Sequence, residues 1–347
     1  MKTTTKFLIL AGLTTALAAC GGGGSGTATP AASSQTASVA APTPVAPTPD
    51  PVATVVTTAA LSTYQAGSEQ ANVFALLNAE RGRCGFGLLT QSAQLDQAAT
   101  AHANYLTANS LDYGHQEAAG LPFFTGTQEA DRAKAAGYTN PVGADLATNS
   151  GPAGAAGKLR TTKQVRGLLG APYHLFSLMD SYADAGIGYS QTQSPVGTAT
   201  LEKSALNITL GRRAGVNDLA ADQVSTYPCA GSTGVNPSLA DETPSSIPLN
   251  LAQDYRAYGT PIVVKVRAGK VLNLNNATIT PAAGGAAIQA QIVSQANDPQ
   301  KGALMRADSA YILPLAPLQA GGSYMVTVSG TNDNAVFTKT FSFSTGQ

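Results

Sequence analysis

Histidine is the scarcest residue able to do acid–base or metal chemistry in this chain: the 347 residues include 3 His, at positions 102, 115 and 174. Imidazole can act as a general base near neutral pH or bind a divalent metal. His174 lies in the stretch LLGAPYHLFSLMDSYADAGIGYS, among apolar and small residues. It therefore either packs in a core or forms half of a site, and the positions of its partners decide between the two.

The 3 Cys of the chain suggest two different kinds of chemistry. Cys20 ends the sequence LAAC, after Lys2, Lys6 and an apolar run too short to span a bilayer. This N-terminus resembles a bacterial lipoprotein signal, which predicts removal of residues 1–19 and acylation of Cys20. An ordinary signal peptide without lipid remains the alternative.

Cys84 and Cys229 are then the two remaining thiols of an exported chain. An even pair in an oxidising compartment predicts a Cys84–Cys229 disulfide. Two free buried thiols are the alternative, and a zinc site built on two such distant cysteines is less favoured.

Composition indicates a tether and excludes one class of partner. Residues 20–66 are rich in Gly, Ser, Thr, Ala and Pro, and we expect them to hold the folded part away from a membrane. Charged residues make up 12% of the chain and the formal net charge is +0. Because nucleic-acid binding needs a concentrated basic surface, we expect no nucleic-acid partner.

The elements that must position the histidines begin with a predicted helix over residues 92–108. Its apolar residues recur at helical spacing and share one face with His102: Leu95, Ala98, Ala99 and Leu106. Thr90 or Ser92 can cap this helix. We therefore expect His102 to be a packed, hydrogen-bonded structural histidine.

Further helices and strands surround the other two histidines. Apolar spacing predicts a helix that ends near Gly82, a short helix closed by Gly137, and a helix over 161–169. Pro172 suits the first turn of a helix that carries His174. Residues 185–190 and 204–211 have the pattern of strands. Helices followed by strands over residues 67–226 predict an α+β domain, in the form of an α-β-α sandwich.

The order of several short motifs resembles the CAP superfamily, which comprises the SCP domains of cysteine-rich secretory, antigen 5 and pathogenesis-related-1 proteins. The motifs are LLNAERGRCGFGLLTQSAQLDQAATAHANYL, then GH, RAKAAGYTNPVGADLA, APYH and GIGY. The resemblance covers residues 71–210 and is closest to bacterial members. It implies an α-β-α sandwich with a central groove that carries two histidines and acidic residues.

On this resemblance, His115 and His174 are the two groove histidines and candidate metal ligands. The sequence departs from the family pattern at four positions, where family Glu, Trp, Ser and Arg residues are replaced by Ala144, Leu168, Ala171 and Leu175. Asp145 or Glu117 could supply the missing carboxylate. The resemblance thus implies at most a weak site for a divalent metal such as zinc.

The last third of the chain has a different pattern. Residues 227–258 are rich in turn-forming residues and predict a connector. Over residues 259–347, short strands alternate apolar and polar side chains between Gly, Asn and Pro turns. This pattern predicts a smaller all-β domain, similar to the Ig-like sandwiches of bacterial surface proteins.

Three functions follow from the sequence as expectations. The first is an exported lipoprotein, anchored to a bacterial membrane on its periplasmic or outer face, whose non-catalytic groove binds a lipid or another small ligand. The second is a metal-assisted hydrolase, in which two imidazoles and a carboxylate hold zinc and leave a position for water. The third is an adhesin or scaffold. The loss of the groove Glu disfavours the enzyme.

Overall fold

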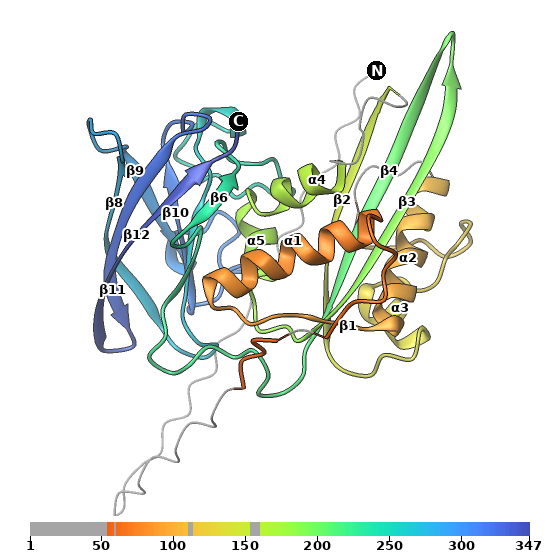
Figure 1. Ribbon diagram of the computed structural model, residues 1–347, viewed down its shortest axis with the longest axis horizontal. Coiled ribbons are helices and arrows are strands. Elements are labelled where there is room, and N and C mark those ends of the chain that lie inside the picture. The colour runs from red at the N-terminus through yellow and green to blue at the C-terminus, as the bar shows by residue number, and fades with distance from the viewer. Residues whose placement is uncertain (1–53, 59, 110–113, 153–159) are drawn as a thin grey trace, which may run out of the picture. The chain divides into compact units, whose positions relative to one another are not determined.

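The structure is a computed structural model that describes residues 54–58, 60–109, 114–152 and 160–347 (Figure 1). The predicted signal peptide, the predicted acylation site at Cys20 and the first part of the predicted tether lie outside the described residues. Within the described ranges, no helix has the length and apolar character needed to cross a membrane.

The end of the predicted tether packs against the folded part. Thr54 bridges to Val216, and the backbone N–H of Val56 donates to Asn217 Oδ1 at 2.8 Å. The Tyr64 hydroxyl bonds to Asp96. Contacts with the folded part therefore begin before residue 67. They lie inside the segment whose low-complexity composition predicts a tether.

Two helices form where capping residues and apolar faces coincide. Helix α1 (Glu69–Cys84) begins at Ser68, whose side chain accepts from Ala71 N–H, and ends at Gly85, which has a φ of 77°. Helix α2 (Ala93–Ala108) begins at Ser92 as predicted, and the apolar face expected from the sequence is buried. His102 is fully buried on that face, as expected.

The first sheet has the strand order β1-β3-β4-β2. Its strands are β1 (Thr90–Gln91), β2 (Val142–Pro152), β3 (Asp184–Val196) and β4 (Ala199–Gly211). Strand β3 packs closely against α2. A Cβ atom added to Gly186 would lie 2.0 Å from the carbonyl carbon of Leu95, and a Cβ atom added to Gly188 would lie 2.1 Å from the carbonyl carbon of Ala99. Glycine at both positions permits this close packing.

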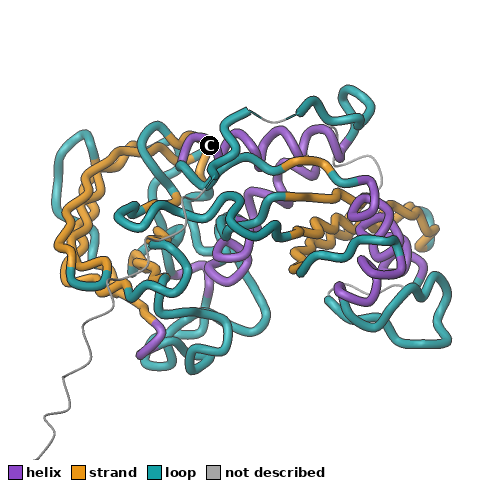
Figure 2. Tube along the Cα trace, turned by 90° about the horizontal axis from the view of Figure 1, so that it is seen from below, coloured by secondary structure: helices purple, strands orange, loops and turns teal. Residues whose placement is uncertain are grey.

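Helices lie on both sides of the first sheet. Helices α2 and α3 (Glu129–Ala135) lie on one side, and α1, α4 (Arg160–Leu168) and α5 (Pro172–Leu178) lie on the other (Figure 1). The view from below shows the strands between these two sets of helices (Figure 2). The chain thus has the mixed α+β structure that the sequence predicts.

Two further sheets form the second half. Their strand orders are β5-β7-β10-β9 and β6-β12-β11-β8. The strands are β5 (Ser225–Tyr227), β6 (Ser232–Val235), β7 (Ile262–Lys265), β8 (Leu272–Pro281), β9 (Ala290–Ser294), β10 (Ser309–Pro314), β11 (Ser323–Asn332) and β12 (Ala335–Thr345). Short 3-10 helices cover Tyr255–Ala257 and Gln295–Asn297. Strands β5 and β6 come from the segment expected to be a connector, so these sheets begin before residue 259.

Strands β7 and β10 are buried on both faces. Ile262 and Ile312 pack into a core shared with strands β8, β11 and β12. Val263 and Tyr311 point the other way, into the core that contains α1 and α5. The two cores therefore meet at these strands, and the described residues from Thr54 onward fall in one compact unit.

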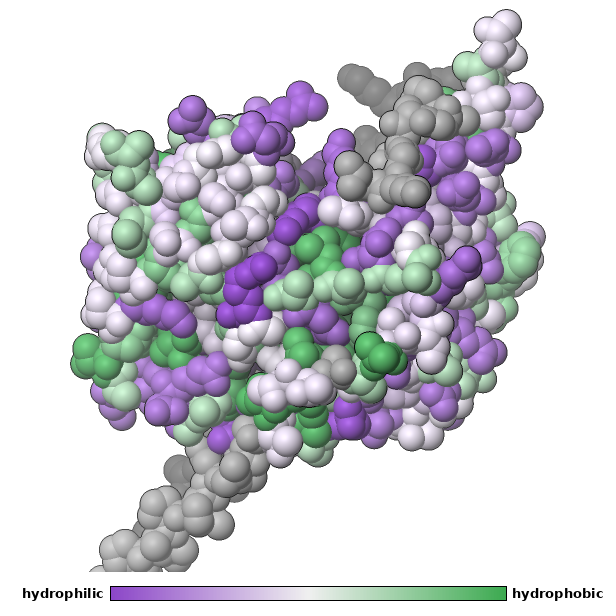
Figure 3. All heavy atoms as spheres, viewed as in Figure 1, coloured by the Kyte–Doolittle hydropathy of each residue, from purple (hydrophilic) through white to green (hydrophobic). Residues whose placement is uncertain are grey.

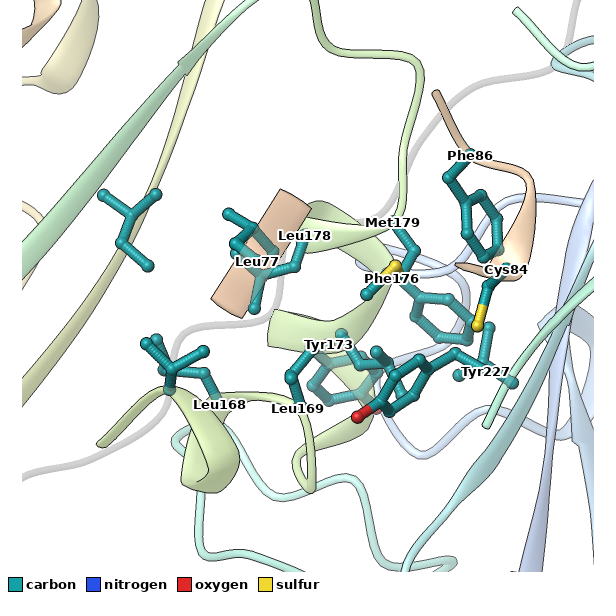
Figure 4. Packing of buried hydrophobic residues seen from close by; sticks show 14 of the residues in the cluster. Leu77, Cys84, Phe86, Leu168, Leu169, Tyr173, Phe176, Leu178, Met179 and Tyr227 are labelled. Carbon is teal, nitrogen blue, oxygen red and sulfur yellow. The ribbon is translucent and has the colours of Figure 1, made fainter. Parts of the chain in front are cut away.

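The disulfide and an aromatic cluster join the two halves. Cys84 at the end of α1 is bonded to Cys229 between β5 and β6, with a Cα–Cα distance of 5.5 Å, which confirms the predicted pairing. Phe176 of α5 and Tyr227 of β5 lie in the same cluster of buried side chains (Figure 4). On the face shown in Figure 3, strongly hydrophilic residues lie among neutral and apolar ones, in keeping with the low charge of the chain.

Candidate functional site

His115 and His174, far apart in the sequence, come together in the structure. Their ring centroids lie 6.3 Å apart and the ring planes are inclined by 30°. His174 belongs to α5, and His115 belongs to the loop between α2 and α3. The structure thus brings together the two histidines that the sequence suggests as a pair.

Helix α5 and a buried carboxylate set the position of His174. Pro172 occupies the first turn of α5. The Glu242 side chain has 0% exposure, lies with Oε2 3.1 Å from His174 Nδ1, and accepts the backbone N–H groups of Tyr173 and His174. Because a carboxylate can only accept, Nδ1 carries a hydrogen, and in the neutral ring the lone pair is then on Nε2. This arrangement suits an imidazole that accepts a hydrogen bond or binds a metal through Nε2.

Glu242 also ties α5 to the second half of the chain. The Tyr255 hydroxyl donates to the Glu242 carbonyl at 2.8 Å, and the Tyr173 hydroxyl donates to Asp298 Oδ1 at 2.6 Å. Both acidic residues come from segments that follow the first sheet. The second half therefore contributes directly to the placement of His174.

His115 keeps contact with solvent. Its side chain is exposed, and its carbonyl accepts from Arg132 Nη2 at 2.9 Å. Partial desolvation lowers the pKa of His115 below the ordinary histidine value, and a proton on His174 would lower it further by repulsion. Solvent screens part of this effect. The His115 ring is therefore mostly neutral at pH 7.

Glu117, which the sequence suggested as a substitute for the missing carboxylate, is buried. Its side chain has 0% exposure and accepts from His102 Nδ1 at 3.0 Å. It also accepts from the backbone N–H of Thr125 at 2.6 Å, and Arg132 lies 3.7 Å away. Glu117 is thus a support beneath the His115 loop, not a wall of the site.

His102 is part of that support. Its Nε2 lies 3.0 Å from the carbonyl oxygen of Gly114, the residue that precedes His115. Burial and the Arg132 charge lower the pKa of His102, and they outweigh the opposing effect of its bonds to Glu117 and Gly114. This is the packed, hydrogen-bonded histidine that the sequence predicts.

Asp145, the other acidic candidate, lies in β2 opposite Ile208 of β4. Its side chain lies outside the described part of the structure. Among the residues that the structure describes, no group of three His, Cys, Asp or Glu side chains is arranged to hold a metal ion.

Glu242 is the residue that sequence reasoning missed. It stands in the segment SLADETPSSIP, where neither spacing nor a neighbouring motif marks it. The one available signal was the scarcity of charge, since any carboxylate in such a chain is a candidate partner for a histidine.

A polar hollow of about 370 Å³ lies elsewhere, between the start of α2 and the loop after α3. Several of its polar side chains are already bonded within the protein. The Tyr138 hydroxyl donates to Asp184 Oδ2 at 2.9 Å, and Arg213 pairs with the same carboxylate at 3.2 Å. Gln91 Nε2 donates to Asp96 at 2.6 Å. The histidine pair is therefore the stronger candidate site.

Replacing His174 with Ala is expected to raise the pKa of His115 towards 6.5, the ordinary value. The substitution removes both a source of desolvation and the repulsion between two imidazolium rings. Imidazole NMR titration measures it directly, because the chain has 3 His and single substitutions assign each signal. An unchanged His115 pKa would mean that the two rings do not interact in solution.

In comparisons with known proteins, the chain matches no protein-family model and no curated protein.

Proposed function

We propose that this protein is a bacterial envelope lipoprotein of the CAP type, whose paired histidines bind one lipid molecule without catalysis. The observation that carries the proposal is the approach of His115 and His174 to 6.3 Å, with His174 oriented by Glu242. Cys20 supplies the acylated N-terminus that keeps the chain at the membrane.

Two features support the CAP assignment. The GH and APYH motifs, which resemble the family, carry His115 and His174, and these two rings lie 6.3 Å apart. Helices lie on both sides of the first sheet, in keeping with an α-β-α sandwich. The two sheets of the second half share one apolar core, which supports an Ig-like sandwich.

Lipid binding is favoured over metal-assisted hydrolysis by the acidic residues around the histidines. Ala144 stands where the family motif has a glutamate, and Glu117 is committed to His102. Glu242 holds the Nδ1 side of His174 and so acts on the ring orientation. An imidazole nitrogen that carries a lone pair can accept a hydrogen bond from a polar headgroup, as a binding site requires.

The test is whether lipid remains bound to the purified, unacylated chain and whether the bound amount depends on the two histidines. Cys20→Ser removes the protein's own acyl chains from the measurement. Bound lipid is expected in this protein and is expected to fall several-fold when both His115 and His174 are replaced by Ala. Tight zinc binding together with hydrolytic activity would favour the enzyme instead.

A further inference from the structure

The loop that follows His115 exposes large apolar side chains in succession. Leu121, Phe123 and Phe124 are 41%, 61% and 38% exposed. Residues 118–125 are all exposed, and residues 118–128 carry no charged side chain. Single exposed apolar residues are common, but a contiguous group on one loop marks an interaction surface. We call residues 121–124 the apolar loop.

The apolar loop is held in place from below. Asn109 Nδ2 donates to the Pro122 carbonyl at 3.0 Å, and the Phe124 N–H donates to the Leu121 carbonyl at 3.2 Å, which closes a turn. The residues that follow, Thr125 and Gly126, donate their backbone N–H groups to the buried Glu117 carboxylate. The loop therefore presents its side chains from a fixed base.

Phe123 has a backbone conformation that a bulky residue rarely adopts. Its φ is 63°, in the left-handed region where Gly or Asn is favoured. A large apolar side chain that is both strained and exposed stabilises neither the fold nor the loop. Such outliers gather at functional positions, where the surrounding structure enforces them.

We infer that the apolar loop docks onto a lipid bilayer and inserts Phe123 among the headgroups. Phe and Leu are side chains that enter the boundary between headgroups and acyl chains. The absence of charge over residues 118–128 fits a surface that binds by apolar contact and needs no anionic lipid.

The chain before the described residues places a bilayer within reach. The segment from Cys20 to Thr54, at up to ~3.5 Å per residue, spans at most on the order of 100 Å. An anchor at Cys20 therefore leaves the apolar loop able to reach the same membrane. The inference rests on the proposed function only for the membrane anchor at Cys20. Docking itself does not need a ligand at the histidines.

The absence of Trp from the chain gives a direct measurement. In the full unacylated chain, Phe123→Trp places the single indole on the apolar loop. With neutral phosphatidylcholine vesicles, its emission is expected to shift to the blue and to be quenched by brominated lipids, equally at low and high salt. Val336→Trp, at a position of β12 that is 83% exposed, is the matched control and keeps solvent-like emission.

A second variant measures the contribution of Phe123. Phe123→Asn suits the left-handed backbone and so preserves the loop, and it is expected to weaken vesicle partitioning about tenfold. Phe123→Trp emission that ignores vesicles would overturn the inference. A blue shift that grows with protein concentration in the absence of vesicles would also overturn it, because it would identify a self-association surface. Docking that persists with His174→Ala separates this inference from the histidine site.

Discussion

Breaking the Cys84–Cys229 disulfide is expected to lower the free energy of unfolding by up to about 5 kcal/mol, from the chain-entropy cost of a loop closed over this sequence separation. The two cysteines are 145 residues apart, and both are buried, with exposures of 6% and 5%. The bond holds the end of α1 against the loop between β5 and β6, which joins the two halves of the chain. Urea unfolding with and without reductant, in Cys20→Ser protein, measures the change.

The control for this prediction is the double variant Cys84→Ala and Cys229→Ala. It should have the low stability of the reduced protein, and reductant should change it no further. If reductant leaves the unsubstituted protein as stable as before, the disulfide does not form in solution or does not constrain the unfolded chain.

Replacing Asp180 with Asn is expected to lower the free energy of unfolding by about 3 kcal/mol, the usual cost of leaving a buried charge without its partner. Asp180 pairs with Lys265 at 3.2 Å, and the two side chains are 7% and 4% exposed. Arg212 and Arg306 reach the same carboxylate but lie partly in solvent, so they tolerate its loss better. Urea unfolding of the variant measures the cost.

A second substitution tests whether the unpaired Lys265 causes the loss of stability. Lys265→Met, added to Asp180→Asn, removes the unpaired buried ammonium and should restore part of the lost stability. Arg306→Gln alone should cost much less, because the Arg306 side chain is 52% exposed. Equal losses from Asp180→Asn and Arg306→Gln would contradict the central position of the Asp180–Lys265 pair.

The Asp180 pair also predicts how stability depends on pH. Burial alone would raise the pKa of Asp180, but Lys265, Arg306 and Arg212 outweigh it and hold that pKa well below the ordinary value of 3.8. The unfolded chain then binds the proton more readily, so this stabilisation is complete above about pH 4 and is lost as the pH falls further. Asp180→Asn should flatten the acid limb of the stability curve.

Helices and strands that bury one face could be predicted from the local sequence. Helix α2 is an example, because Ser92 and the spacing of its apolar residues depend only on the nearby sequence. Strand β10 is harder to recognise, because all six of its residues are buried and no alternation of apolar and polar side chains marks it. Burial on both faces follows from packing between the halves, which local periodicity does not report.

Buried charges were the other limit of sequence reasoning. Arg81 looks like a solvated helix residue, yet it is fully buried and donates to five backbone carbonyls, including those of Leu178 and Asp180. Glu242 likewise depends on contacts between distant segments. The histidine pair could be suggested from motifs, whereas the carboxylate that orients it could be found only from the fold.

The lipid content of the purified chain tests the proposed function most directly. Native mass spectrometry would compare three forms of unacylated Cys20→Ser protein: otherwise unsubstituted, with both His115→Ala and His174→Ala, and with Gln116→Ala at an exposed neighbouring position. The account predicts about one bound lipid per chain in the first and third forms, and several-fold less in the form without the two histidines. The same lipid content in all three forms, or none in the otherwise unsubstituted one, would contradict it.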